Sequence, residues 1–455
     1  MTLANRIAFV VFCAAIVFTA LAYGTVHQPI ILLFYTLVAT MFVLWMVDSA
    51  KTGVLRFSRD PVQLLIYAAA VYGFVQVIPF GSYAEIAGVA EISKTISLDP
   101  FITKMTAIHF LVLGVMFSVV LVLLDSASRI RRLALLIAVF SFGFAFFAIL
   151  QGVLSPDRIF GVYEAPAGAS PYGSFVNRHN FAAYMEMGIA IPLGLLFTGA
   201  VAADKRLLSI TAVGLMGVSL LLSGSRGGLI AFVAQVIFLV ILTVKTGRSS
   251  EIYLKSGLAV MLLAAVVGGS FFVGGESSLT RIADTAGSRD ITTDRSHIWT
   301  VTMKVIGDNL PFGAGLGAFG VAYTKHDSYS GLERVEQAHN DYLQAVADAG
   351  LVGLILGGLF IWFIFQLGRR AVRTENRFRR GVGIGALSGV FAILVHSVFD
   401  FVLHTTAISV LFLTLVALLI ASLSRYEDDI EDSSRPSRRG HKGARRSRAP
   451  SLPVA

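Results

Sequence analysis

The run LALLIAVFSFGFAFFAILQGVL, residues 133–154, contains no charged residue and is long enough to cross a bilayer as one helix. About 20 apolar residues span a hydrocarbon core of roughly 30 Å. Backbone groups in lipid must bond within their own segment, so such a run is predicted to be helical. We count twelve runs of this kind, at about 7–24, 29–47, 61–80, 106–124, 133–154, 181–203, 207–223, 227–244, 256–275, 350–367, 381–398 and 402–423.

The composition agrees with a chain that lies mostly in lipid. Of its 455 residues, 55% are hydrophobic and only 14% are charged, whereas soluble domains carry about 25% charged residues. The first run exceeds the usual 7–15 apolar residues of a signal peptide, so we expect an uncleaved helix. Cys13 is the single cysteine, which excludes an internal disulfide and a cysteine-based metal site. The sequence predicts an all-α polytopic membrane protein with about 12 transmembrane helices.

The distribution of Lys and Arg predicts the orientation of these helices. With the N-terminus in the cytoplasm, 26 of the 37 basic residues fall in cytoplasmic segments and 11 in outer segments, as the positive-inside rule requires. Both termini are then cytoplasmic, and residues 276–349 form one large periplasmic loop. The net charge of +9 is therefore mainly a topology signal, and we expect no nucleic-acid partner.

The domain organisation follows from the same pattern. Residues 1–423 form the transmembrane domain, and residues 424–455 form a charged tail that is acidic first and then basic. With few apolar residues, this tail is predicted to be disordered and cytoplasmic. Contact with anionic lipid headgroups and simple solvation both fit its composition. An interfacial helix is expected near residues 83–91.

The large loop is predicted to contain two short helices. Thr293 or Asp294 suits the N-cap of a helix that starts near Arg295 and ends before Pro311. A second helix is expected to start close to His339 and to run into the tenth span. Residues 315–320 between them match GxGxxG. No strand precedes this motif, so it is interpreted as a tight connection rather than a dinucleotide site.

His339 is the first candidate for chemistry. An imidazole accepts a proton near neutral pH, which suits a general base. A histidine that only caps a helix or bonds a loop carbonyl is the structural alternative. Asn340 beside it, Asn180 and Arg178 are candidate supporting residues. Asp341 and Asp348 are expected to solvate helix surfaces, while His396, Asp400 and His404 fit either a polar cluster or interfacial solvation.

Two arginines are candidates for binding an anion. Arg226 lies in a turn of Gly and Ser that lets backbone amides approach an anionic group, although arginines at span ends often serve only as interfacial anchors. Arg295 is predicted in the first turn of a helix, where a cation opposes the helix dipole, so a phosphate is its expected partner. Arg289 is a weaker candidate of the same kind.

Taken in order, these motifs resemble the bacterial O-antigen ligase and polymerase superfamily of membrane glycosyltransferases. The resemblance rests on Ser223-Gly224-Ser225-Arg226-Gly227, on Asp294-Arg295-Ser296-His297-Ile298-Trp299 followed by Pro311-Phe312-Gly313-Ala314-Gly315, and on His339-Asn340-Asp341-Tyr342-Leu343. Asn177-Arg178-His179-Asn180-Phe181 at the start of a span also fits. The resemblance covers roughly residues 60–425.

The resemblance implies an enzyme of the inner membrane with a periplasmic active site. Such enzymes transfer a glycan from undecaprenyl pyrophosphate to a hydroxyl, either of lipid A–core (ligases) or of another lipid-linked glycan (polymerases). The implied chemistry is inverting and uses neither metal nor cofactor. Arg226 and Arg295 would bind the pyrophosphate, and His339 would be the base. The alternative class, a transporter of an anion or a lipid-linked sugar, predicts broken helices and internal pseudo-symmetry, which the sequence does not indicate. The oligomeric state is not predicted.

Overall fold

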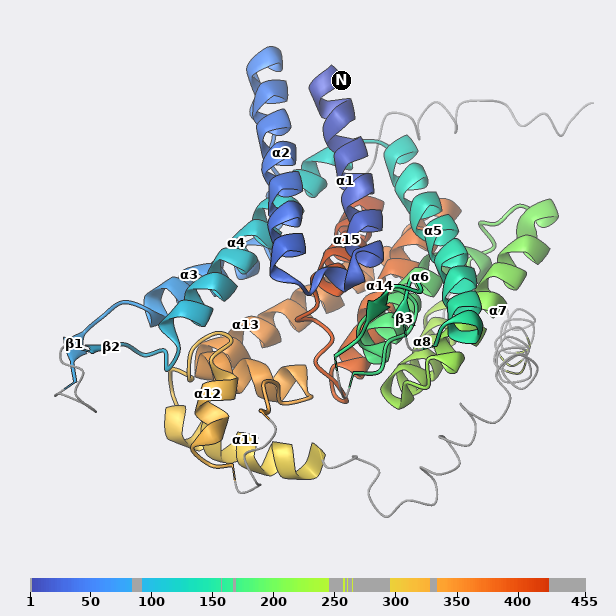
Figure 1. The fold of residues 1–455 in the computed structure, drawn as a ribbon. Coiled ribbons are helices and arrows are strands. Elements are labelled where there is room, and N and C mark those ends of the chain that lie inside the picture. The colour runs from blue at the N-terminus through green and yellow to red at the C-terminus, as the bar shows by residue number, and fades with distance from the viewer. Residues whose placement is uncertain are drawn as a thin grey trace, which may run out of the picture.

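A computed structural model describes residues 2–83, 92–156, 158–166, 169–244, 295–327 and 334–424, with the isolated residues 257, 260 and 264. The described chain is mostly helical (Figure 1). Its α-helices are α1 (Leu3–Leu21), α2 (Gln28–Thr52), α3 (Val62–Gln76), α4 (Pro100–Leu123), α5 (Ala127–Leu154), α6 (Arg178–Phe197), α7 (Arg206–Leu222), α8 (Arg226–Val244), α11 (Arg295–Asn309), α12 (Phe319–Thr324), α13 (Asp341–Val372), α14 (Arg377–His396) and α15 (Thr406–Ser422). Two 3-10 turns, η1 (Tyr23–Thr25) and η2 (Ala203–Lys205), and two small antiparallel pairs complete the described elements: β1 (Gly81–Ser82) with β2 (Ser93–Lys94), and β3 (Arg158–Ile159) with β4 (Tyr163–Glu164).

The predicted all-α membrane class is confirmed. In the described part of the chain, nine helices are long and apolar enough to cross a membrane, and the apolar helices α3 and α15 are shorter. Each of these eleven helices coincides with a predicted run. The twelfth run, residues 256–275, lies outside the described residues apart from three isolated positions. The expected helix near residues 83–91, the tail after Ser424, the predicted caps Thr293 and Asp294, and Arg289 also lie outside them.

Three helices form the centre of the bundle. Almost every residue of α15 is buried, and so are most residues of α6 and α14. By contrast, α2 and α13 leave most of their apolar side chains uncovered. Apolar side chains on the outside of a membrane bundle face lipid, so α2 and α13 are peripheral helices.

The central helices α6 and α14 cross with their backbones in near contact. A Cβ atom added to Gly194 would lie 2.4 Å from the Cα of Gly385, and one added to Gly385 would lie 2.7 Å from the carbonyl oxygen of Ala190. Small residues permit this approach between membrane helices. The crossing brings the beginning of α6 and the end of α14 to the same side of the bundle.

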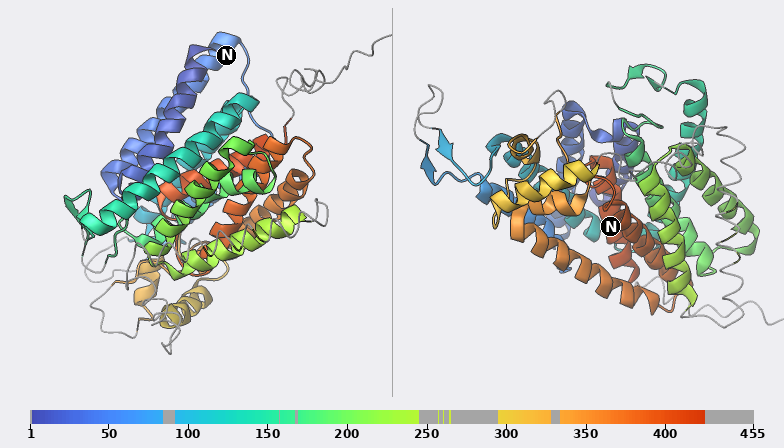
Figure 2. Two further views of the ribbon diagram at one scale, coloured as in Figure 1. Left: turned by 90° about the vertical axis from the view of Figure 1, so that its right-hand side faces the viewer. Right: turned by 90° about the horizontal axis from the view of Figure 1, so that it is seen from below.

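The loop helices lie at the end of the bundle opposite the N-terminus (Figures 1 and 2). As predicted, the first runs from Arg295 to Asn309, and the second starts beside His339 and continues into a membrane span. α13 changes direction at Gly350, whose φ is +57°. A Cβ there would meet the carbonyl oxygen of Pro311 at 2.1 Å, and Leu351 N donates to that same oxygen. Only glycine permits this contact.

Candidate functional site

His339 is held in a conformation that a non-glycine residue rarely adopts. Its φ is +48°, in the left-handed region where such residues carry strain of order 1–3 kcal/mol. The residues around it fix this conformation. Trp299 of α11 donates its indole N–H to the carbonyl of Ala338, and the side chain of Gln344 accepts from Ala338 N. Asn340 caps α13 by accepting from Tyr342 N and Leu343 N. The strain is therefore imposed by contacts on both sides of His339.

Asp400, in the segment between α14 and α15, joins His339 to Arg295. Its Oδ1 lies 3.1 Å from His339 Nδ1, and its Oδ2 lies 3.0 Å from Arg295 Nη2. Arg295 also donates to the carbonyl of Phe399. The side chain of Asp400 is only 3% exposed, whereas that of His339 is 31% exposed. The carboxylate is thus a buried anchor, and the imidazole remains accessible.

The charge of Asp400 is stabilised by these neighbours. Burial alone would raise the pKa of its carboxyl, but the hydrogen bond with His339 and the nearby charge of Arg295 outweigh burial and hold the pKa below its usual value. Asp400 is therefore ionised at neutral pH. An ionised carboxylate at Nδ1 favours the tautomer with the proton on that nitrogen, leaving Nε2 as the basic atom.

The turn that contains Arg226 lies beside this carboxylate. His179, the second residue of α6, has its Nδ1 2.9 Å from Ser225 Oγ and 3.6 Å from Asp400 Oδ2. Ser225 Oγ also accepts from Gly228 N and so caps α8. Arg226 is the first residue of α8. The beginnings of α6, α8, α11 and α13 therefore meet the end of α14 at one place.

A buried acid–imidazole pair lies behind the turn. His396 Nδ1 is 2.9 Å from Glu186 Oε1, and both side chains are fully buried. The two glycines after Arg226 pack on this pair. A Cβ on Gly227 would lie 3.1 Å from the His396 ring, and one on Gly228 would lie 3.2 Å from Glu186 Oε1. The glycines therefore let the start of α8 approach the pair closely.

The structure brings together some of the predicted residues. His339 and Arg295 share Asp400, and Arg226 follows Ser225 directly. Asn340 supports His339 as a cap, and its Nδ2 also donates to the carbonyl of Val398. Arg178 is the first residue of α6 and Asn180 is buried on the same helix. His179, which lies between them, contacts Ser225 and Asp400.

Three residues of the cluster were not predicted to act with His339: His179, Glu186 and Asp400. Asp400, with His396 and His404, was expected either in a polar cluster or in interfacial solvation, and His179 lies between two residues that were chosen as supporting ones. Glu186 carried a signal of its own, because a carboxylate inside an apolar run is a functional candidate in a membrane protein.

The expectation that Asp341 and Asp348 solvate helix surfaces was wrong. Asp341 accepts from Ser397 Oγ at 2.7 Å and contacts His404 Nδ1 at 3.2 Å. Asp348 is buried and accepts from Gly317 N at 3.0 Å. The loops fold over both carboxylates and supply their partners. Asp348 thus fixes the GxGxxG segment, which is the tight connection that the sequence predicted.

One group within the described residues has donor atoms suited to a metal ion. Donor atoms of His179, His396 and Asp400 lie within 4.8 Å of one another. The guanidinium of Arg295 is already bonded to this carboxylate, so the positive charge at Asp400 comes from the chain itself. With Arg178 and Arg226 adjacent in sequence to His179 and Ser225, the surroundings suit an anionic ligand.

Comparison with known families finds a match over one part of the chain. Residues 211–358 match the family model described as O-antigen ligase. No curated protein matches the chain. The matched segment contains Arg226, Arg295 and His339, while His179 and Asp400 lie outside it. The match covers about a third of the chain and supports the resemblance to the O-antigen ligase superfamily, whose enzymes act in polysaccharide assembly.

Proposed function

We propose that this chain, which carries an O-antigen ligase domain, transfers a glycan from undecaprenyl pyrophosphate to an acceptor hydroxyl at the periplasmic face of the inner membrane. The contact between His339 and Asp400, next to Arg295 and the Arg226 turn, is the observation that carries the proposal. It combines a base, its orienting carboxylate and cations suited to a pyrophosphate. The helix ends that form the cluster lie opposite the N-terminus, which the charge distribution assigns to the cytoplasm.

In the proposed reaction His339 acts as the general base. Asp400 holds Nδ1, and Nε2 takes the proton of the acceptor hydroxyl as its oxygen attacks the anomeric carbon. The bond from that carbon to the pyrophosphate oxygen breaks in the same step, so the configuration inverts. The imidazolium then releases its proton to water. A positioned base contributes about 10²–10⁴-fold to such a rate.

Arg226 and Arg295 would stabilise the leaving group. Undecaprenyl pyrophosphate gains negative charge as the glycosidic bond breaks, and a planar guanidinium binds phosphate oxygens in a bidentate manner. One preorganised donor at such a position is typically worth about 2.7–4 kcal/mol of transition-state stabilisation. Arg295 is bonded to Asp400 on one side, so its guanidinium is held in place before the donor arrives.

The test is transfer by purified protein in liposomes that contain a lipid-linked glycan and an acceptor. We expect His339→Ala, Arg226→Ala and Arg295→Ala each to abolish transfer while the protein inserts normally. His326→Ala is a matched control, because His326, just after α12, pairs with Asp308 of α11 and should leave transfer intact. Full activity of His339→Ala would overturn its assignment as the base.

Gene deletion distinguishes the two acceptors. If the chain is a polymerase, single repeat units should accumulate on the lipid carrier. If it is a ligase, long chains should remain on the carrier and none should reach lipid A–core. An unchanged pattern of lipid-linked glycans would contradict both forms of the proposal.

A further inference from the structure

His179 lies between the two halves of the cluster. One half is the turn with Ser225 and Arg226, and the other is Asp400 with its partners His339 and Arg295. His179 Nδ1 is 2.9 Å from Ser225 Oγ and 3.6 Å from Asp400 Oδ2. Asn177 caps α6 by accepting from His179 N at 2.8 Å, so the ring projects from a fixed backbone position.

The contacts exclude one familiar function for these residues. Ser, His and Asp together suggest a serine nucleophile, which requires the serine at one ring nitrogen and the carboxylate at the other. Here both partners face the same nitrogen, Nδ1. Ser225 Oγ is also occupied as the cap of α8, where it accepts from Gly228 N at 3.2 Å. Ser225 is therefore not arranged to form a covalent glycosyl intermediate.

The direction of the hydrogen bond follows from the charges. The ionised carboxylate of Asp400 near Nδ1 favours a proton on that nitrogen, because a lone pair there would face the negative charge. The N–H then donates to Ser225 Oγ, with Asp400 as a second, longer contact. The start of α8 and the segment after α14 are thus joined through one imidazole.

We propose that His179 is a positioning residue that couples the placement of Arg226 to the carboxylate that holds His339 and Arg295. The inference rests on the proposed function, since it assigns Arg226 to the pyrophosphate and His339 to the acceptor. With His179 in place, the pyrophosphate site and the base keep a fixed separation. Without His179, the position of α8 is no longer linked to that of the segment after α14.

The experiment compares three variants by steady-state kinetics in liposomes. His179→Phe keeps the aromatic volume and removes the donor, whereas His179→Asn places an amide N–H near the position of Nδ1. We expect His179→Phe to raise KM for the lipid-linked donor and to lower kcat, so that kcat/KM falls by about 10–100-fold, as for a displacement of about 1 Å. His179→Asn should stay within about threefold of wild type. Tyr342→Phe is the control, since it removes a single bond to the Leu394 carbonyl without touching Asp400.

The shift in KM separates positioning from general destabilisation. A fraction of misfolded protein lowers kcat and leaves KM unchanged. If His179→Phe does not fold, Ser225→Ala removes the other partner of the same bond and should raise the donor KM in the same way. In a folded double variant the two changes should be non-additive. Wild-type KM in both single variants would overturn the inference, while absence of transfer by the wild-type protein would instead overturn the proposed function.

Discussion

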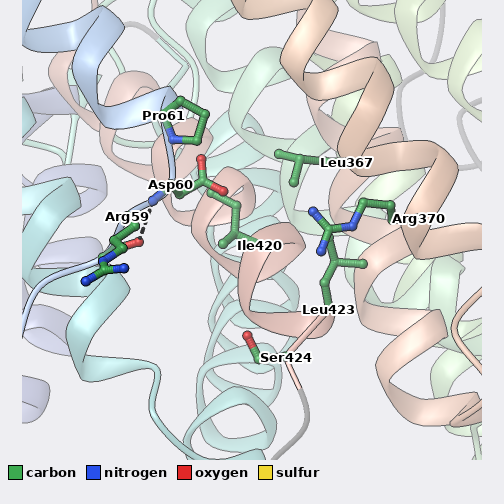
Figure 3. Close-up of a pocket in the computed structure, with 9 residues that line it drawn as sticks. Arg59, Asp60, Pro61, Leu367, Arg370, Ile420, Leu423 and Ser424 are labelled. Carbon is green, nitrogen blue, oxygen red and sulfur yellow. Dashed lines mark hydrogen bonds between the residues drawn. The ribbon is translucent and has the colours of Figure 1, made fainter.

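Two ends of the molecule each place an aspartate beside an arginine, and the two pairs behave differently. At the end with the loop helices Asp400 is bonded to Arg295 at 3.0 Å, and the hydrogen bond with His339 and the charge of Arg295 hold the pKa of the carboxyl below its usual value. At the other end Asp60 faces Arg370 across a pocket of about 440 Å³ (Figure 3). There burial raises the pKa of Asp60, and the opposing effect of Arg370 is the smaller one.

The difference between the two pairs indicates which charged side chains belong to a functional site. Around Asp400 the polar side chains are desolvated and bonded to one another, an arrangement that is costly unless every partner is in place. Arg59 and Arg370 in the pocket are exposed, and exposed charges interact weakly. Arginines at this end of the bundle are what the positive-inside rule predicts for cytoplasmic helix ends. The first pair belongs to the candidate active site, and the second is consistent with topology alone.

The largest expected effect comes from neutralising the two aspartates in turn. Asp400→Asn deprives Arg295 and His339 of their shared counter-charge, so transfer should fall by about 10²–10⁴-fold. The free energy of unfolding should fall by about 3–5 kcal/mol, as for a broken buried pair. Asp60→Asn is the matched control and should change stability by about 0.5 kcal/mol or less, because an amide oxygen still accepts from Val62 N. Transfer is measured in liposomes, and the free energy of unfolding is measured by denaturation in detergent. Equal losses in the two variants would mean that Asp400 and Asp60 do not differ in function.

A smaller effect is expected from the caps of two helices. Asn340 caps α13 at the end with the loop helices, and Asn376 caps α14 at the opposite end by accepting from Arg379 N. Replacing either with Ala should cost about 0.5–2 kcal/mol in stability. Only Asn340→Ala should also lower transfer, by roughly 10–100-fold, because it releases the strained backbone of His339. If both variants lose activity in proportion to stability, the cap does not position the base.

The sequence predicted the helices correctly, but it predicted fewer of the contacts between them. Apolar length indicated the spans, and Pro311 with the spacing of Ile298 and Trp299 indicated the loop helix Arg295–Asn309. Asn340 and His339 could be placed at a helix start for the same local reasons. Each of these predictions depends on neighbours within about one or two helical turns.

The contacts of Asp400 are of another kind and could not be predicted in this way. Asp400 lies 61 residues from His339 and 105 from Arg295, and no periodicity relates positions on separate helices. His179 was missed because the choice among Arg178, His179 and Asn180 depends on the rotation of α6, which the crossing with α14 determines. Asp341 and Asp348 were misjudged because the folding of loops over a helix start decides whether a carboxylate there is solvated.

A modest effect of pH on stability is expected from His404, at the end with the loop helices. Burial would lower the pKa of His404, but its hydrogen bond and charge interaction with Asp341 raise that pKa above the usual value. The stabilisation is therefore fully present below the ordinary histidine pKa and is lost as pH rises through the raised one. Because 37% of the His404 side chain is exposed, the effect should be at most about 1 kcal/mol. Thermal unfolding between pH 5.5 and 9 should show this loss, and His404→Gln should remove it. A loss of the same size in His404→Gln would assign it to another group.

The smallest effect is expected from Arg370→Gln. Arg370 is exposed at the end of α13, and within the described residues its guanidinium makes no ion pair with Asp60. Losing one of many exposed positive charges should leave both transfer and the free energy of unfolding nearly unchanged, the latter within about 0.5 kcal/mol. Arg295→Gln removes the same charge where it is bonded to a buried carboxylate, and should reduce kcat by about 10²–10³-fold. A comparable loss in Arg370→Gln would mean that the pocket beside Asp60 takes part in transfer. Burial and mutual hydrogen bonding would then no longer distinguish the functional charges from those that only set the topology.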